Sequence, residues 1–89
     1  MSEKDKKDET IDVNIETTWL QKGDFTFKKS NKVKDILKEV AWFFGREDYE
    51  NLRLVRNQRE LDPLRSLAEH EIETGETLVV KDAGLLEQA

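Results

Sequence analysis

The chain contains no cysteine. It can therefore form no disulfide bond, and it offers neither a thiolate nucleophile nor a thiolate metal ligand. His70 is the only histidine, and no serine is patterned with it as a nucleophile and base. The carboxylates lie between apolar residues as solvated faces, and there is no glycine-rich phosphate loop. We expect a protein that is not an enzyme and that binds neither a metal nor a cofactor.

Long apolar runs and an excess of positive charge are also missing. No stretch approaches the roughly 18 apolar residues that span a membrane, and the N-terminus is charged where a signal peptide has an apolar core. The chain has 20 acidic and 15 basic residues, and its net charge of -5 repels a phosphate backbone. We expect a soluble, cytoplasmic protein that binds neither nucleic acid nor a membrane.

Apolar residues are few but regularly placed. They make up 36% of the chain against 39% charged residues, yet from Ile11 onward they follow regular patterns. Residues 1-10 have no apolar residue after Met1, and we expect a disordered charged tail there. Residues 11-82 are predicted to form one domain around a small core, and residues 83-89 a flexible tail.

The first part of the domain predicts a hairpin. Residues 11-16 alternate apolar with polar side chains, as a strand with one buried face does. Phe25 and Phe27 repeat that alternation after Gly23, which can adopt positive φ where the chain turns back. Residues 18-22 would form the connecting loop.

A helix is predicted to follow the hairpin. Ser30 or Asn31 can cap its start, and Gly45 stands where a glycine ends helices. Trp42 falls opposite the apolar stripe, so we expect it to be exposed. The stripe, which would pack on the sheet, consists of Val33, Ile36, Leu37, Val40, Ala41 and Phe44.

Residues 52-80 contain two more strand patterns around an irregular segment. In the first, Leu54 points inward and Val55 outward, and a brief edge strand then ends at Leu61. The irregular segment has the spacing of a capping box, Ser66-x-x-Glu69, which predicts a single helical turn. In the last strand Leu78 and Val80 are predicted to point inward and Val79 outward. A hairpin followed by a crossover helix and a return to the sheet would make the first and last strands parallel neighbours.

This order of elements resembles ubiquitin over residues 11-84. The resemblance implies an α+β, ubiquitin-like β-grasp fold: a mixed four- to five-stranded sheet with one main helix packed across one face. Its most specific part is the run from Ser66-Leu67 through Ile72 to Thr77-Leu78. The matching core positions are Val13, Ile15, Phe25, Phe27, Val33, Ile36, Val40, Leu54, Leu61, Leu67, Ile72, Leu78 and Val80.

The resemblance also implies a protein-binding surface on the open face of the sheet. Val55 falls on the position of the central isoleucine in the family's apolar patch, whereas Lys81 replaces a valine of that patch. Tryptophan beside aliphatic residues and arginine is typical of binding hot spots. We expect a monomer that binds proteins through a patch made of Trp19, Leu20, Arg53, Val55, Val79 and Lys81.

Two functions are compatible with this resemblance, and they differ at Gly84. In the first, the chain is the precursor of a protein modifier in a prokaryotic or divergent conjugation system. A deubiquitinase-like peptidase would remove residues 85-89, and an E1-like adenylating enzyme and an E2-like conjugating enzyme would act on the freed carboxylate. In the second, the chain is a non-conjugated binding module, such as an adaptor or a small subunit of a secretion or other multiprotein assembly. A sulfur carrier would need the same freed glycine.

Overall fold

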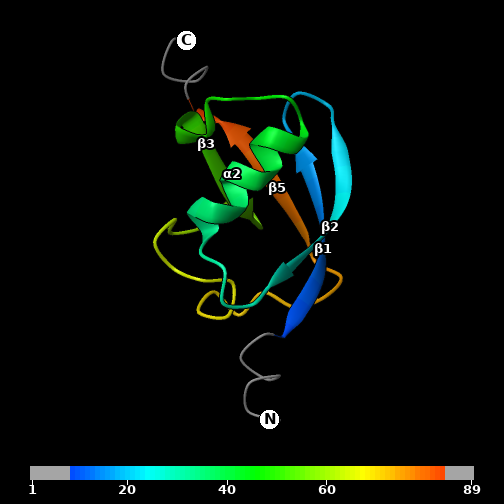
Figure 1. Cartoon of the computed structure of the whole chain (residues 1–89), viewed down its shortest axis with the longest axis vertical. Coiled ribbons are helices and arrows are strands. Elements are labelled where there is room, and N and C mark those ends of the chain that lie inside the picture. Colours follow the sequence, from blue (N-terminus) through cyan, green and yellow to red (C-terminus); the bar gives the residue numbers. More distant parts are fainter. Residues whose placement is uncertain (1–8, 84–89) are drawn as a thin grey trace.

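One helix lies across one face of a five-stranded mixed sheet in the computed structural model, which describes residues 9-83 (Figure 1). The strand order is β2-β1-β5-β3-β4, with β1 and β5 parallel and the other pairs antiparallel. The predicted α+β fold and its parallel first and last strands are confirmed. The elements are β1 (Thr10–Thr17), β2 (Lys22–Lys28), α2 (Val33–Phe43), η1 (Tyr49–Asn51), β3 (Leu52–Arg56), β4 (Arg59–Glu60) and β5 (Thr77–Asp82).

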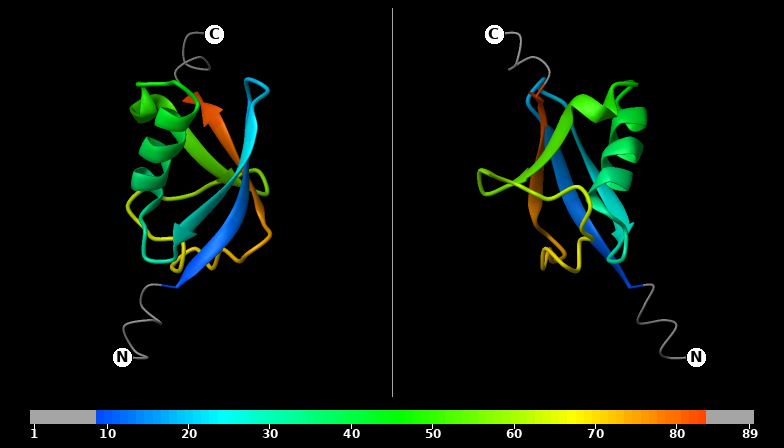
Figure 2. Two further views of the ribbon diagram at one scale, coloured as in Figure 1. Left: turned by 45° about the vertical axis from the view of Figure 1, so that its right-hand side comes forward. Right: turned by 90° about the vertical axis from the view of Figure 1, so that its left-hand side faces the viewer.

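The core lies between α2 and the sheet. In β1 every second side chain is buried, which places Ile11, Val13 and Ile15 toward the helix. Figure 2 shows α2 on one side of the sheet only, so the other side, here called the open face, is not covered by a helix in the described part of the chain. The buried apolar residues of the core are Ile11, Val13, Ile15, Phe27, Val33, Ile36, Leu37, Val40, Ala41, Leu52, Leu54, Leu61, Leu67, Ile72, Leu78 and Val80.

The start of α2 differs from the prediction. Neither Ser30 nor Asn31 caps the helix; Lys32 occupies the N-cap position and makes no side-chain capping bond. Backbone carbonyls from a distant segment take this role, because the N–H of Val33 donates to the carbonyl of Arg65 (2.9 Å) and the next N–H to that of Pro63 (3.0 Å). The first N–H groups of a helix have no partner inside it. Here residues 63-65 supply those partners.

The end of α2 matches the prediction. Gly45 has φ of 77°, and its N–H donates to the carbonyl of Trp42 (3.1 Å). The N–H of Arg46 donates to the carbonyl of Ala41 (2.7 Å). This pair of bonds is a Schellman motif, which needs a left-handed residue at the glycine position.

The irregular segment between β4 and β5 holds the predicted capping box. The N–H of Ser66 donates to the Glu69 carboxylate (2.9 Å), and the N–H of Glu69 donates to the Ser66 hydroxyl oxygen (3.1 Å). The box closes hydrogen-bonded turns instead of a helix. Leu67 and Ile72 in this segment are buried in the core.

The N-terminal boundary lies slightly earlier than expected. Thr10 opens β1 by pairing with Lys28, and the N–H of Lys29 donates to the carbonyl of Glu9 (2.8 Å). Backbone pairing needs no apolar side chain, which is why the composition of residues 1-10 could not place this boundary. Within the described residues, no helix has the length and apolar character required to cross a membrane.

Candidate protein-recognition surface

The register of the sheet brings four of the six expected patch residues together. Arg53 is opposite Lys81, and Val55 is opposite Val79, on neighbouring strands β3 and β5. Leu54 and Val80, which lie between these residues along the two strands, face the core. Since successive side chains of a strand point to opposite faces, the four expected residues lie side by side on the open face.

Val55 is nevertheless covered. Only 9% of its surface is exposed, although its side chain points to the open face. Glu60 of β4 and Lys81 of β5 form an ion pair (3.5 Å), and β4 and β5 flank β3 on opposite sides. The ion pair between Glu60 and Lys81 therefore crosses β3 on the face that carries Val55. Long charged side chains cover apolar surface with their aliphatic parts, which explains the burial.

Trp19 is not part of this group. Its ring packs edge-on against Phe44 of the helix end, with centroids 6.5 Å apart, and the Arg46 guanidinium lies 4.4 Å from the ring centroid. Its indole N–H donates to Gln21 Oε1 (2.5 Å). The structure thus directs Trp19 toward the core side, because Phe44 and Arg46 offer it an aromatic and a cationic partner there.

Leu20 remains at the border of the open face. It is 95% exposed and has φ of 72°, so it projects from the tip of the β1–β2 hairpin. It lines a shallow depression of about 340 Å³ together with Glu16 and Lys22, whose side chains lie on the open face. Glu16 is in turn opposite Val79. We call Leu20, Arg53, Val79 and Lys81 the open-face patch.

Arg46 connects three elements at the end of the molecule where β5 finishes. Its guanidinium binds Asp48 (2.6 Å) and the buried Asp82 (2.5 Å), and it stacks on Trp19. Hydrogen bonds raise the pKa of Arg46, with the bond to Asp48 contributing most and the bond to Asp82 next. The bond between Arg46 and Asp48 also lowers the pKa of Asp48. Figure 2 shows the hairpin tip, the end of α2 and the end of β5 at this same end.

A second group of exposed apolar side chains lies at the end of α2. Trp42 is 82% exposed, as predicted, and Phe43 is 61% exposed. The Phe43 ring packs edge-on against Phe25 of β2 (5.0 Å) and against Phe44 (5.1 Å). The helical period alone places Phe43 beside the stripe, but its contact with β2 depends on the position of the hairpin.

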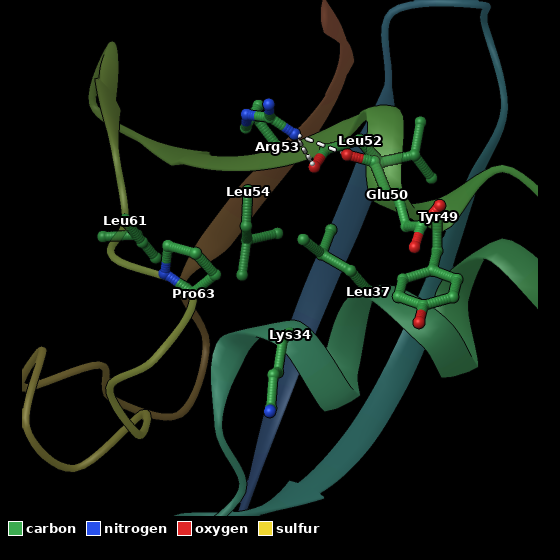
Figure 3. A pocket seen from close by; sticks show the side chains of 9 residues that line it. All are labelled: Lys34, Leu37, Tyr49, Glu50, Leu52, Arg53, Leu54, Leu61 and Pro63. Carbon is green, nitrogen blue, oxygen red and sulfur yellow. Dashed lines mark hydrogen bonds between the residues drawn. The ribbon is translucent and has the colours of Figure 1, made fainter.

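A small pocket opens between α2 and β3 (Figure 3). Its volume is about 330 Å³, and Leu37, Leu54 and Pro63 are among its apolar walls. The Arg53 side chain leaves β3 on the open face, and its guanidinium reaches the rim of this pocket, where it donates to the carbonyls of Glu50 (2.9 Å) and Leu52 (3.0 Å). The cationic group at the rim is thereby engaged with the protein's own backbone.

Two other residues discussed in the sequence analysis, Gly84 and His70, are not part of this surface. Gly84, the candidate processing and conjugation site, is outside the described residues. His70 lies in the segment before β5, with Nε2 at 3.1 Å from the carbonyl oxygen of Asp62. This contact is local to the segment that connects β4 to β5.

Comparison with known proteins gives a result for structure and none for sequence. No protein-family model and no curated protein sequence matches the chain significantly. Among solved structures, the ubiquitin-like domain of Plasmodium falciparum Dsk2 is 19% identical, with a TM-score of 0.74 over 82% of this chain and 97% of that one. A structure from work on molecular mimicry of SUMO in DNA repair is 20% identical, with a TM-score of 0.75 over 80% of this chain and 89% of that one.

A protein designed on the basis of ubiquitin is also similar. It is 28% identical, and its TM-score is 0.72 over 81% of this chain and 87% of the designed one. All three align with most of the described domain, and their TM-scores of 0.72 to 0.75 indicate a common fold. The chain is therefore a ubiquitin-like protein by fold, with the β-grasp architecture that its sequence resembles.

Proposed function

We propose that the chain acts by protein recognition, through the open-face patch. The observation that carries this proposal is the juxtaposition of Val79, Arg53 and Lys81 on the open face, with Leu20 exposed at its border. An apolar centre with arginine and a charged rim is the common composition of protein interfaces. The partner that fits is a protein with an apolar anchor and carboxylates around it.

Site-specific crosslinking tests this proposal. A photo-crosslinking amino acid at Val79 should trap a defined protein in the native cell, whereas the same group at Glu39, on the exposed face of α2, should not. The double substitution Arg53→Glu with Lys81→Glu should abolish the adduct without unfolding the domain. A third probe at the exposed Trp42 covers the helix side. Adducts from Trp42 and none from Val79 would assign recognition to the helix side instead.

We further propose that this recognition is non-covalent. The support is the contact between Arg46 and the buried Asp82, which holds β5 to its last residue. Only Ala83 separates Asp82 from Gly84, so an extended chain reaches about 7 Å from the Cα atom of Asp82 to that of Gly84. That is a short reach for a glycine carboxylate that must enter an adenylating enzyme.

The modifier function is the second candidate, and the glycine shortly after the last strand favours it. In this form Gly84 becomes the C-terminus after a peptidase removes residues 85-89, and E1-like and E2-like enzymes act on it. Intact mass of the protein from its native cell distinguishes the two. An 84-residue form or adducts larger than the chain would support the modifier, and the 89-residue protein alone would support the non-covalent module.

A further inference from the structure

The outer edge of β2 is available for pairing. This strand is seven residues long, ends the sheet, and pairs only with β1 in the part of the chain that the structure describes. The strand at the opposite end of the sheet, β4, has two residues. An edge strand carries a row of backbone N–H and C=O groups that can pair with another strand.

The register shows which groups face outward. The N–H of Thr17 donates to the carbonyl of Gln21, and the N–H of Lys29 donates to the carbonyl of Glu9, so odd-numbered residues of the second strand bond to the first. In an antiparallel pair, alternate residues direct their backbone groups to opposite sides. The N–H groups of Asp24, Thr26 and Lys28 therefore point away from the sheet.

We propose that a second copy of the chain pairs with this edge, antiparallel, about a two-fold axis at Thr26. In this register Thr26 faces its own copy, and Asp24 of each chain faces Lys28 of the other. Both charged side chains lie on the open face, exposed, and neither forms an ion pair within residues 9-83. Opposite charges directly across a strand pair stabilise it, and a two-fold axis repeats the contact.

The alternative register shifted by one pair is less favourable. If Asp24 faced Thr26 of the other copy, Lys22 would face Lys28, and like charges directly opposite destabilise a pair. Of these two registers, the Thr26-centred one brings the three charged residues of the strand to opposite or neutral partners, since Lys22 then faces Ser30.

The apolar side of the edge supports the same arrangement. Phe25 of one copy would face Phe27 of the other on the helix side of the sheet. Phe43 is 61% exposed and packs against Phe25 (5.0 Å), so it lies at this edge. A second copy would remove part of this aromatic surface from water. The proposal thus replaces the monomer expected from the sequence with a weakly associating dimer.

Charge exchange tests the register. Sedimentation equilibrium of the wild-type protein should show a reversible monomer–dimer equilibrium. Asp24→Lys and Lys28→Asp should each weaken dimerisation by about tenfold or more, because each sets two like-charge pairs across the axis. The double variant Asp24→Lys with Lys28→Asp should restore it. Weakening that the double variant does not reverse would overturn the register.

Cysteine crosslinking provides an independent measurement, because the native chain has no cysteine. Opposite residues that exchange backbone hydrogen bonds have Cα atoms about 5.5 Å apart, within disulfide range. Under mild oxidation Thr26→Cys should form a covalent dimer, and a mixture of Asp24→Cys and Lys28→Cys should form the mixed dimer. Asp24→Cys alone places its two cysteines about 14 Å apart along the strands and should not crosslink.

A variant that removes one backbone N–H from the outer edge of β2 completes the test. Thr26→Pro deletes an N–H that points away from β1, so the fold should persist by circular dichroism while the dimer is lost. A wild-type protein that stays monomeric at millimolar concentration would overturn the proposal. The exposed lysines of β2 would then serve to keep the edge solvated.

Discussion

Arg46 and Asp82 form an ion pair (2.5 Å) that joins the end of α2 to the end of the last strand. The Asp82 side chain is buried, with 7% of it exposed, whereas the Arg46 side chain is 25% exposed and its guanidinium also covers Trp19. One side chain therefore stabilises the hairpin loop, the helix end and β5 together.

Replacing Arg46 should destabilise the domain strongly. Arg46→Ala takes the cation away from a buried carboxylate and uncovers Trp19, and we expect a loss of about 2-3 kcal/mol in the free energy of unfolding. Urea denaturation measures it. Arg65→Ala is the matched control, because its ion pairs are exposed on both sides, and it should cost less than about 0.5 kcal/mol. Equal losses in the two variants would contradict the role of burial.

Stability should fall in acid partly through Glu76. Burial opposes its ionisation, but the N–H of Glu73 and the Arg56 guanidinium outweigh burial, so the pKa of Glu76 lies below its ordinary value of 4.5. The folded state thus holds this proton less tightly than the unfolded state, and the stabilisation is full above pH 4.5 and is lost as pH falls through the lower folded value.

Substitution checks this pH dependence. In Glu76→Gln the difference in unfolding free energy between pH 7 and pH 3 should be smaller than in the wild type. Arg56→Gln should also make this difference smaller. Urea titrations at several pH values give these differences. An unchanged difference in both variants would show that other carboxylates account for the acid sensitivity.

The two valines of the open face should respond differently to charge. Val55→Asp buries a carboxylate next to Glu60, and we expect a loss of about 2-3 kcal/mol. Val79→Asp changes a partly exposed position and should cost under about 1 kcal/mol. Thermal or chemical denaturation compares them directly. If Val55→Asp is as mild as Val79→Asp, the Lys81–Glu60 pair does not cover Val55 in solution.

Leu67 should contribute much more than its neighbour Leu64. Leu67 is fully buried in the core, and Leu64 is 65% exposed. Leu67→Ala should cost about 2-4 kcal/mol through lost burial and the cavity that remains. Leu64→Ala, the same chemical change three residues earlier, should cost less than about 0.5 kcal/mol. A small effect at Leu67 would mean that the segment between β4 and β5 is not held by its buried side chains.

Most of the fold could be predicted because its signals are local. The alternation around Val13, the helical spacing from Val33 and the glycine at 45 each operate within a few residues. The isolated Leu67 and Ile72 also identify core positions, since a lone apolar residue among charges gains most from burial.

The surface could be predicted less well, because its features arise from residues far apart in the sequence. Trp19 packs on Phe44 and beneath Arg46, more than 20 positions later, and nothing near it in the sequence indicates this choice. Val55 is covered by charged side chains from both neighbouring strands, which only the register reveals. The predicted N-cap of α2 was wrong for the same reason, because the carbonyls that accept its first N–H groups come from residues 63-65.

The carbonyls of Pro63 and Arg65 that receive the first N–H groups of α2 also bear on how the chain is made. A ribosome releases the residues of α2 about thirty positions before it releases their partners. At usual rates of synthesis, that delay is on the order of seconds, far longer than a helix needs to form or melt. These two capping bonds can therefore form only after residues 63-65 have emerged, and the sheet is completed later still, because β5 lies between β1 and β3.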